Sequence, residues 1–131
     1  MTDSNWKIFL TIARNILGKG ENVAWASESW CAFTTFSMLS HDLTYWAIGL
    51  PEIHDLLDSR TKDGCLWGQS FDYSDLAHMI LPAHFYWEKS DKEKGFLYGY
   101  KQQKIQALSA ELNANGIEHR ITDLVLEVKL Y

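Results

Sequence analysis

Residues 85–100, FYWEKSDKEKGFLYGY, contain two aromatic runs separated by a charged segment that ends in glycine. Residues 85–88 and 96–100 have the composition of β-strands, because aromatic side chains suit a pleated surface. Residues 90–95, SDKEKG, have the composition of a short connection. Two such runs joined by a short segment containing glycine are typical of a β-hairpin. We therefore predict two antiparallel strands here.

The last part of the chain predicts a further strand over residues 124–130. Leucine or valine at every second position alternates there with Glu127 and Lys129. This period of two marks a strand with one buried face. Residues 117–121 predict a shorter strand that leads into it. We expect the C-terminal strand to be part of the sheet.

Two segments predict amphipathic helices. Residues 4–17 repeat apolar side chains at steps of three and four, with Ser4 as the N-cap and Gly18 directly after the end. Residues 101–114 predict the second helix, which places Ile105, Leu108 and Leu112 on one face and ends at Gly116.

The segment between residues 23 and 48 is less determined. Residues 23–25 predict a short strand. Residues 30–48 are rich in β-branched and aromatic side chains and predict two strands joined by a turn at residues 40–42. A helix over residues 29–39 is the alternative, because Trp30, Phe33 and Phe36 also fit helical spacing.

Two further short helices are predicted in the middle of the chain. Pro51 suits the first position of a helix, and residues 61–64 form the loop that follows it. Residues 72–80 predict the other helix, which Pro82 ends.

These elements predict the α+β class in a single domain over residues 1–131. The expected architecture is a mainly antiparallel sheet built from hairpins, with helices packed on it and the C-terminal strand inside it. A chain of 131 residues has the usual length of one domain.

The charge of the chain restricts its partners. There are 12 Lys and Arg against 17 Asp and Glu, and the net charge is −5. Nucleic acids and anionic membranes both require a basic surface, so we expect neither as a partner. Residues 1–5 lack the features of a secretory signal, and Cys31 and Cys65 are too few for a disulfide framework. We expect a cytoplasmic protein with two free buried thiols, and a Cys31–Cys65 bridge is the alternative.

The chain contains no motif typical of catalysis or of metal binding. Its five histidines and two cysteines do not have the spacing of metal ligands. Ser70 lacks the second glycine of a nucleophile elbow, and Gly18-Lys19-Gly20 follows a predicted helix where a dinucleotide-binding loop would follow a strand. The sequence therefore predicts no catalytic residue, no metal and no cofactor, and hence no enzyme.

The excess negative charge is concentrated in residues 50–80, which hold six acidic and two basic side chains. The same stretch contains aromatic residues among residue types typical of loops. Carboxylates can attract a basic partner and aromatic rings can anchor it. The alternative is that the rings belong to the core and the acids are merely solvated. The predicted partner-binding residues are Glu52, Asp55, Asp58, Asp63, Trp67, Asp72, Tyr73 and Asp75.

The chain resembles, in its profile, the immunity proteins of bacterial toxin systems of the contact-dependent growth inhibition type. The residues that carry the resemblance are the acidic stretch 52–75 and the closing segment 116–131, GIEHRITDLVLEVKLY. The resemblance implies a protein that binds a cognate, basic, nuclease-like toxin domain and neutralises it by occlusion and charge complementarity.

Two other functions stay open at this point. One is a small-ligand-binding domain or enzyme with a pocket lined by Trp46, Trp67, His78, His84 and Tyr98. The other is an assembly subunit joined through an exposed strand.

Overall fold

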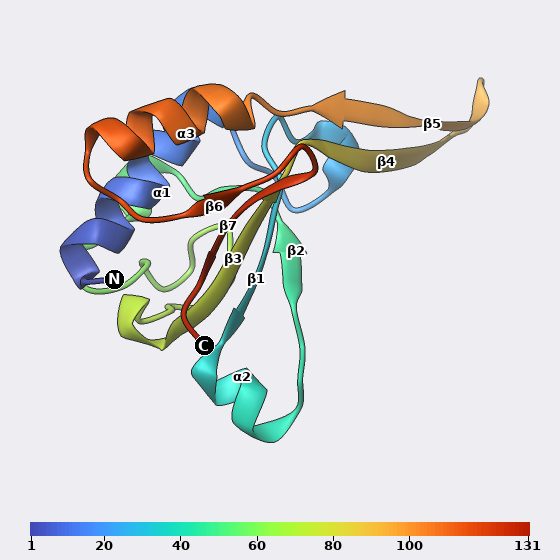
Figure 1. Ribbon diagram of the computed structural model, residues 1–131. Helices are drawn as coiled ribbons and strands as arrows, with labels where there is room; N and C mark the ends of the chain where they lie inside the picture. Colours follow the sequence, from blue (N-terminus) through green and yellow to red (C-terminus); the bar gives the residue numbers. More distant parts are fainter.

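The computed structural model describes all residues, 1–131, and confirms the α+β class (Figure 1). It consists of a five-stranded antiparallel sheet of order β2-β1-β3-β7-β6 and a separate two-stranded sheet, β4-β5, which extends away from it. The elements are α1 (Asp3–Leu17), η1 (Ala24–Ala26), β1 (Cys31–Thr35), α2 (Phe36–His41), β2 (Trp46–Ile48), η2 (Ile53–Asp55), η3 (Tyr73–Asp75), β3 (Leu76–Pro82), β4 (His84–Asp91), β5 (Gly95–Gln102), α3 (Ile105–Ala114), β6 (Arg120–Ile121) and β7 (Val125–Lys129).

The five-stranded sheet is built around β3. This strand pairs with β1 on one side and with β7 on the other, both antiparallel. In β7, Leu126 and Val128 are buried while Glu127 and Lys129 face away from the core. The predicted strand over residues 124–130 is therefore confirmed, and so is its position inside the sheet.

Helices α1 and α3 pack together on one face of this sheet (Figure 1). The cap of α1 is Thr2 rather than Ser4, because the Thr2 hydroxyl accepts a hydrogen bond from the Asn5 amide at 3.0 Å. Gly18 ends the helix with φ 103°, a conformation that glycine adopts without strain. Helix α3 begins at Ile105, four residues later than predicted, because β5 continues to Gln102.

The core contains all three aromatic rings of residues 50–75, those of Trp67, Phe71 and Tyr73. The indole of Trp67 stacks on Phe33 with 4.2 Å between ring centroids, and its Nε1 donates to the Gly49 carbonyl at 2.9 Å. The Tyr73 hydroxyl donates to the Leu57 carbonyl at 2.7 Å, and burial first of all raises its pKa to about 12. Hydrogen-bonded polar ends allow such rings to be buried without an unpaired group.

Four secondary-structure predictions are wrong or incomplete. The helix over residues 72–80 is instead the single turn η3 followed by β3. After Pro51 only the single turn η2 forms. In place of the strand predicted over residues 23–25, Val23 is extended but unpaired and Ala24–Ala26 form η1. The strands within residues 30–48 form as predicted, but α2 replaces the turn at residues 40–42, since the Thr35 hydroxyl caps it by accepting from the Met38 amide at 3.0 Å.

Both cysteines are buried and unbridged, as expected, and burial raises the pKa of the Cys31 thiol. None of the helices has the length and apolar character needed to cross a bilayer.

Candidate protein-binding surface

The β4–β5 hairpin is the part of the molecule that projects furthest from its body (Figure 1). It follows β3 after a bend at Ala83, and its strands pair in register from His84 opposite Gln102 to Asp91 opposite Gly95. At the tip, the Asp91 carboxylate accepts hydrogen bonds from the Lys94 and Glu93 amides, both at 2.8 Å. These bonds lower the pKa of Asp91 and fix the turn, so the hairpin has a defined end.

One face of the hairpin is uncovered along its whole length. Residues directly opposite each other in an antiparallel pair point to the same side. All the side chains on this side are exposed, and four of them are aromatic: Tyr86 is 43% exposed, Phe96 57%, Tyr98 64% and Tyr100 72%. The eight residues of this side are His84, Tyr86, Glu88, Ser90, Phe96, Tyr98, Tyr100 and Gln102. We call Tyr86, Glu88, Phe96, Tyr98 and Tyr100 the aromatic face.

The rings of the aromatic face contact one another. Tyr86 and Tyr100 meet edge to face at 5.4 Å between centroids, and Phe96 stacks on Tyr98 at 5.9 Å. The Tyr86 hydroxyl donates to Glu88 Oε2 at 3.0 Å. Neighbouring rings restrict each other's rotamers, which lowers the conformational entropy lost when a partner binds.

The opposite face of the hairpin fastens it to the body. The Lys101 ammonium donates to three carbonyl oxygens of the segment around η1, those of Trp25 and Ser27 at 2.8 Å and that of Ala24 at 3.2 Å. The Phe85 ring stacks on Trp30 at 5.8 Å between centroids. These contacts hold the base of the hairpin, so the aromatic face has a fixed orientation.

The side chain of Gln103 provides a second fastening directly after β5. Its Oε1 accepts from the Trp30 amide at 2.9 Å, and its Nε2 donates to the carbonyl oxygens of Trp30 at 2.9 Å and Pro82 at 3.0 Å. The side-chain amide pairs with the Trp30 backbone as a strand residue would.

The charges of the hairpin are divided between its faces. The ammonium of Lys89 lies 4.2 Å from the centre of the Trp25 ring, and Lys101 is bound to carbonyls, so both point away from the aromatic face. The only charged side chain at pH 7 on the aromatic face is Glu88. The aromatic face therefore presents to a partner the faces of aromatic rings and one carboxylate.

Two of the predicted partner-binding residues are excluded by burial. Trp67 is 1% exposed and Tyr73 is fully buried, so neither ring can contact a partner. Both belong to the main hydrophobic core of the chain. For these rings the alternative reading, that they are core residues, is correct.

The acidic residues of the predicted site lie at the surface, but several have partners within the chain. Glu52 binds Arg14 at 3.1 and 3.3 Å, and Asp58 binds Lys7 at 2.7 Å. The Lys7 contact lowers the pKa of Asp58. Since these charges are already compensated, the stretch is less negative than its sequence indicates.

The other predicted acids differ in their surroundings. Asp75 accepts from the amide and hydroxyl of Ser37 at 3.2 and 2.9 Å, and Asp55 lies 3.5 Å from His54. Asp63 and Asp72 are exposed and form no ion pair.

The predicted ligand pocket does not form. Its five residues are distributed over the core, the sheet and the hairpin, and of the four principal hollows in the surface only one includes any of them, His84. No three His, Cys, Asp or Glu side chains lie close enough together to hold a metal ion.

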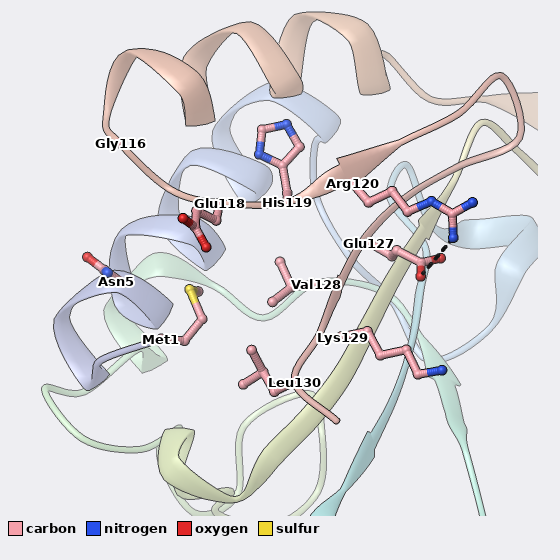
Figure 2. A pocket seen from close by; sticks show the side chains of 10 residues that line it. All are labelled: Met1, Asn5, Gly116, Glu118, His119, Arg120, Glu127, Val128, Lys129 and Leu130. Carbon is pink, nitrogen blue, oxygen red and sulfur yellow. Dashed lines mark ion pairs between the residues drawn. The ribbon is translucent and has the colours of Figure 1, made fainter.

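A groove of about 610 Å³ lies between the N-terminus of α1, the segment before β6 and β7 (Figure 2). Its charged groups have mixed signs, and Arg120 and Glu127 approach each other to 4.0 Å. The His119 ring points toward α3, where its Nε2 lies 2.7 Å from the Ser109 hydroxyl, and its Nδ1 lies 2.9 Å from the Ile117 carbonyl. With its imidazole engaged and its charges balanced, this groove offers no concentrated chemistry for a ligand.

Comparisons of the chain with protein families, with curated proteins and with solved structures found no match.

Proposed function

We propose that this chain is a binding protein of the immunity type, which neutralises a basic protein partner by covering it with the aromatic face of its β4–β5 hairpin. The acidic stretch and the profile of the sequence support a partner of positive charge. In this proposal the contact surface lies on the hairpin rather than on residues 52–75. The protein makes and breaks no covalent bond.

The observation that carries the proposal is an exposed aromatic surface on a rigidly held arm. Four rings that are 43–72% exposed present about 470 Å² together, taking about 200 Å² for each full side chain. Exposed patches of this size on a single chain are often functional. Burying it would contribute about 12 kcal/mol before the losses of association are subtracted. Tyrosine is also among the residues that dominate binding energies at interfaces.

The chemistry of this surface favours a basic protein over other partners. Arginine and lysine side chains bind the faces of aromatic rings, and Glu88 offers them a carboxylate. Single-stranded nucleic acids also stack on aromatic rings, but they require a positively charged groove beside them. The aromatic face carries no lysine or arginine.

The test compares capture of partners from the native cell by the wild type and by the double variant Tyr98→Ser/Tyr100→Ser. Leu43→Ser is the control, since Leu43 is an exposed apolar side chain near the α2–β2 connection, away from the hairpin. We expect the wild type to capture a basic protein. The double variant should bind that protein at least about 100-fold more weakly than the wild type does, and the control should bind it as the wild type does. Expressed alone, that protein should stop growth, and this chain should restore it.

Three results would contradict the proposal. A partner bound equally by the double variant would place the interface elsewhere. A partner that is harmless when expressed alone would exclude an immunity role. Self-association that disappears in the double variant would assign the aromatic face to a second copy of the chain, which is the assembly alternative.

A further inference from the structure

A second aromatic surface lies at the base of the hairpin, beside the aromatic face. It is a shallow groove of about 450 Å³ between the edge of β4, the η1 segment and β2. Three of the six tryptophans of the chain line it. The main lining residues are Trp25, Trp30, Ala47, Tyr86, Glu88 and Trp87.

The rings of this groove do not fill it by packing on each other. The close aromatic pairs of the chain include none between Trp25, Trp30, Tyr86 and Trp87. Trp25 is 42% exposed, although an indole is usually largely buried. The space between the rings is therefore open to an occupant.

The indole N–H groups of the groove also lack acceptors. In the core, Trp67 donates its N–H to the Gly49 carbonyl. None of the N–H groups of Trp25, Trp30 and Trp87 donates a hydrogen bond within the chain, and those of Trp30 and Trp87 are not among its buried unpaired groups. Three tryptophans that line the groove therefore carry indole N–H groups that no acceptor within the chain uses.

The positions of these rings are fixed from behind. The indole of Trp87 lies across Gly99, where an added Cβ would come within 3.0 Å of its Nε1. Trp30 is held by its stack on Phe85 and by the backbone contacts of Gln103. Trp25 is held by the Lys89 ammonium over its ring. Such preorganisation reduces the entropy lost on binding.

We infer that this groove binds a proline-rich segment of a protein partner in the polyproline II conformation, with a basic residue of that segment beside Glu88. A polyproline II segment has no internal hydrogen bonds, so its carbonyl oxygens are free to accept from indole N–H groups. Its proline rings fit between aromatic side chains, which is how aromatic-lined grooves recognise such segments. An α-helix would be a poorer partner for the same N–H groups, since its backbone carbonyl oxygens already accept hydrogen bonds within the helix.

The Glu88 carboxylate at the edge of the groove favours a basic residue next to the prolines of the bound segment. Glu88 is exposed and has no ion-pair partner in the chain. An arginine adjacent to the prolines would complement it. This inference deepens the proposed function, because Tyr86 and Glu88 belong to both surfaces.

The experiment titrates the ¹⁵N-labelled chain with three synthetic probes: decaproline, decaproline with one flanking arginine, and a Gly/Ser decapeptide. The indole N–H resonances report each tryptophan separately. We expect both proline probes to shift the resonances of Trp25, Trp30 and Trp87 saturably and to leave those of Trp6 and Trp67, which are buried, in place. The Gly/Ser peptide should cause no saturable shift.

Variants separate the roles of the groove residues. Trp25→Ala removes an exposed ring, so it should fold and should raise the Kd for both proline probes at least about tenfold. Glu88→Gln should raise the Kd about threefold to tenfold only for the probe that carries arginine. Tyr98→Ser/Tyr100→Ser should raise the Kd for both probes less than Trp25→Ala does, because neither ring lines the groove and only their contacts with Tyr86 are lost.

The inference is overturned if the proline probes cause no saturable shift, if the Gly/Ser peptide binds as well as they do, or if Trp25→Ala binds them like the wild type. Loss of probe binding with normal neutralisation of a basic partner would remove this inference and leave the proposed function intact. If the probes bind but no partner depends on Tyr98 and Tyr100, the inference stands and the proposed function is wrong.

Discussion

Gln103 fastens the hairpin to the body, and its replacement by leucine tests that role. The side chain is 8% exposed and makes three hydrogen bonds, to the Trp30 amide, the Trp30 carbonyl and the Pro82 carbonyl. Leucine has nearly the same bulk but no polar atom. The substitution therefore leaves three backbone groups without their partners in a largely buried setting.

The expected loss follows from those three groups. A buried donor or acceptor without a partner costs about 1–3 kcal/mol, and water will reach some of these groups once the base of the hairpin loosens. We expect Gln103→Leu to lower the free energy of unfolding by about 3–5 kcal/mol. A change of this size is a large fraction of the stability of a typical domain.

Urea unfolding followed by far-ultraviolet circular dichroism measures the change. Gln102→Leu is the matched control, since the neighbouring glutamine is exposed on the aromatic side of the hairpin and should alter stability by less than about 0.5 kcal/mol. Hydrogen exchange of the Trp30 amide should accelerate only in Gln103→Leu. If Gln103→Leu stays within about 1 kcal/mol of the wild type, the side chain does not hold the hairpin as described.

Three further predictions concern single residues. Gly99→Ala should displace the indole of Trp87, because an added Cβ would lie 3.0–3.2 Å from it; we expect a shifted Trp87 indole resonance and a loss of about 1 kcal/mol, and an unchanged resonance would contradict the packing. The Lys7 contact lowers the pKa of Asp58 in the folded state, so the ion pair stabilises the fold above the ordinary pKa of 3.8, and this stabilisation is lost as the pH falls through the lowered pKa. In Lys7→Met, an NMR titration should find the pKa of Asp58 closer to 3.8 than in the wild type. The same pKa in both proteins would refute the ion pair. Burial raises the pKa of the Cys31 thiol, so Cys31 should react with a thiol reagent only after unfolding, and rapid labelling of the native chain would count against its position in the core.

The parts of the fold that local pattern determines could be predicted from the sequence. The hairpin of residues 85–100 carries its own turn, and β7 carries its own alternation of buried and exposed side chains. Strand β3 lacks such a signal, because its apolar run fits a buried strand or a helix equally well. Its pairing with β1 and β7, each more than 40 residues away, decides the outcome.

The candidate site shows the same division. The aromatic residues at positions 86, 96, 98 and 100 could be assigned to one face once the hairpin register was known. Which face of the hairpin would be covered depends on η1 and Trp30, which no local pattern connects to it. The burial of Trp67 and Tyr73 could not be predicted for a similar reason, since residues outside helices and strands are buried only through contacts with distant parts of the chain.

Only Ala83 separates β3 from β4, so the projecting arm is a direct prolongation of the central strand of the molecule. A partner that clamps the arm would therefore also restrain the strand around which the sheet is assembled. Complex formation should then slow amide exchange far from the contact, along β3 and its neighbours, and protect the whole chain from proteases. Binding of a partner to the arm would thus stabilise the central strand of the sheet.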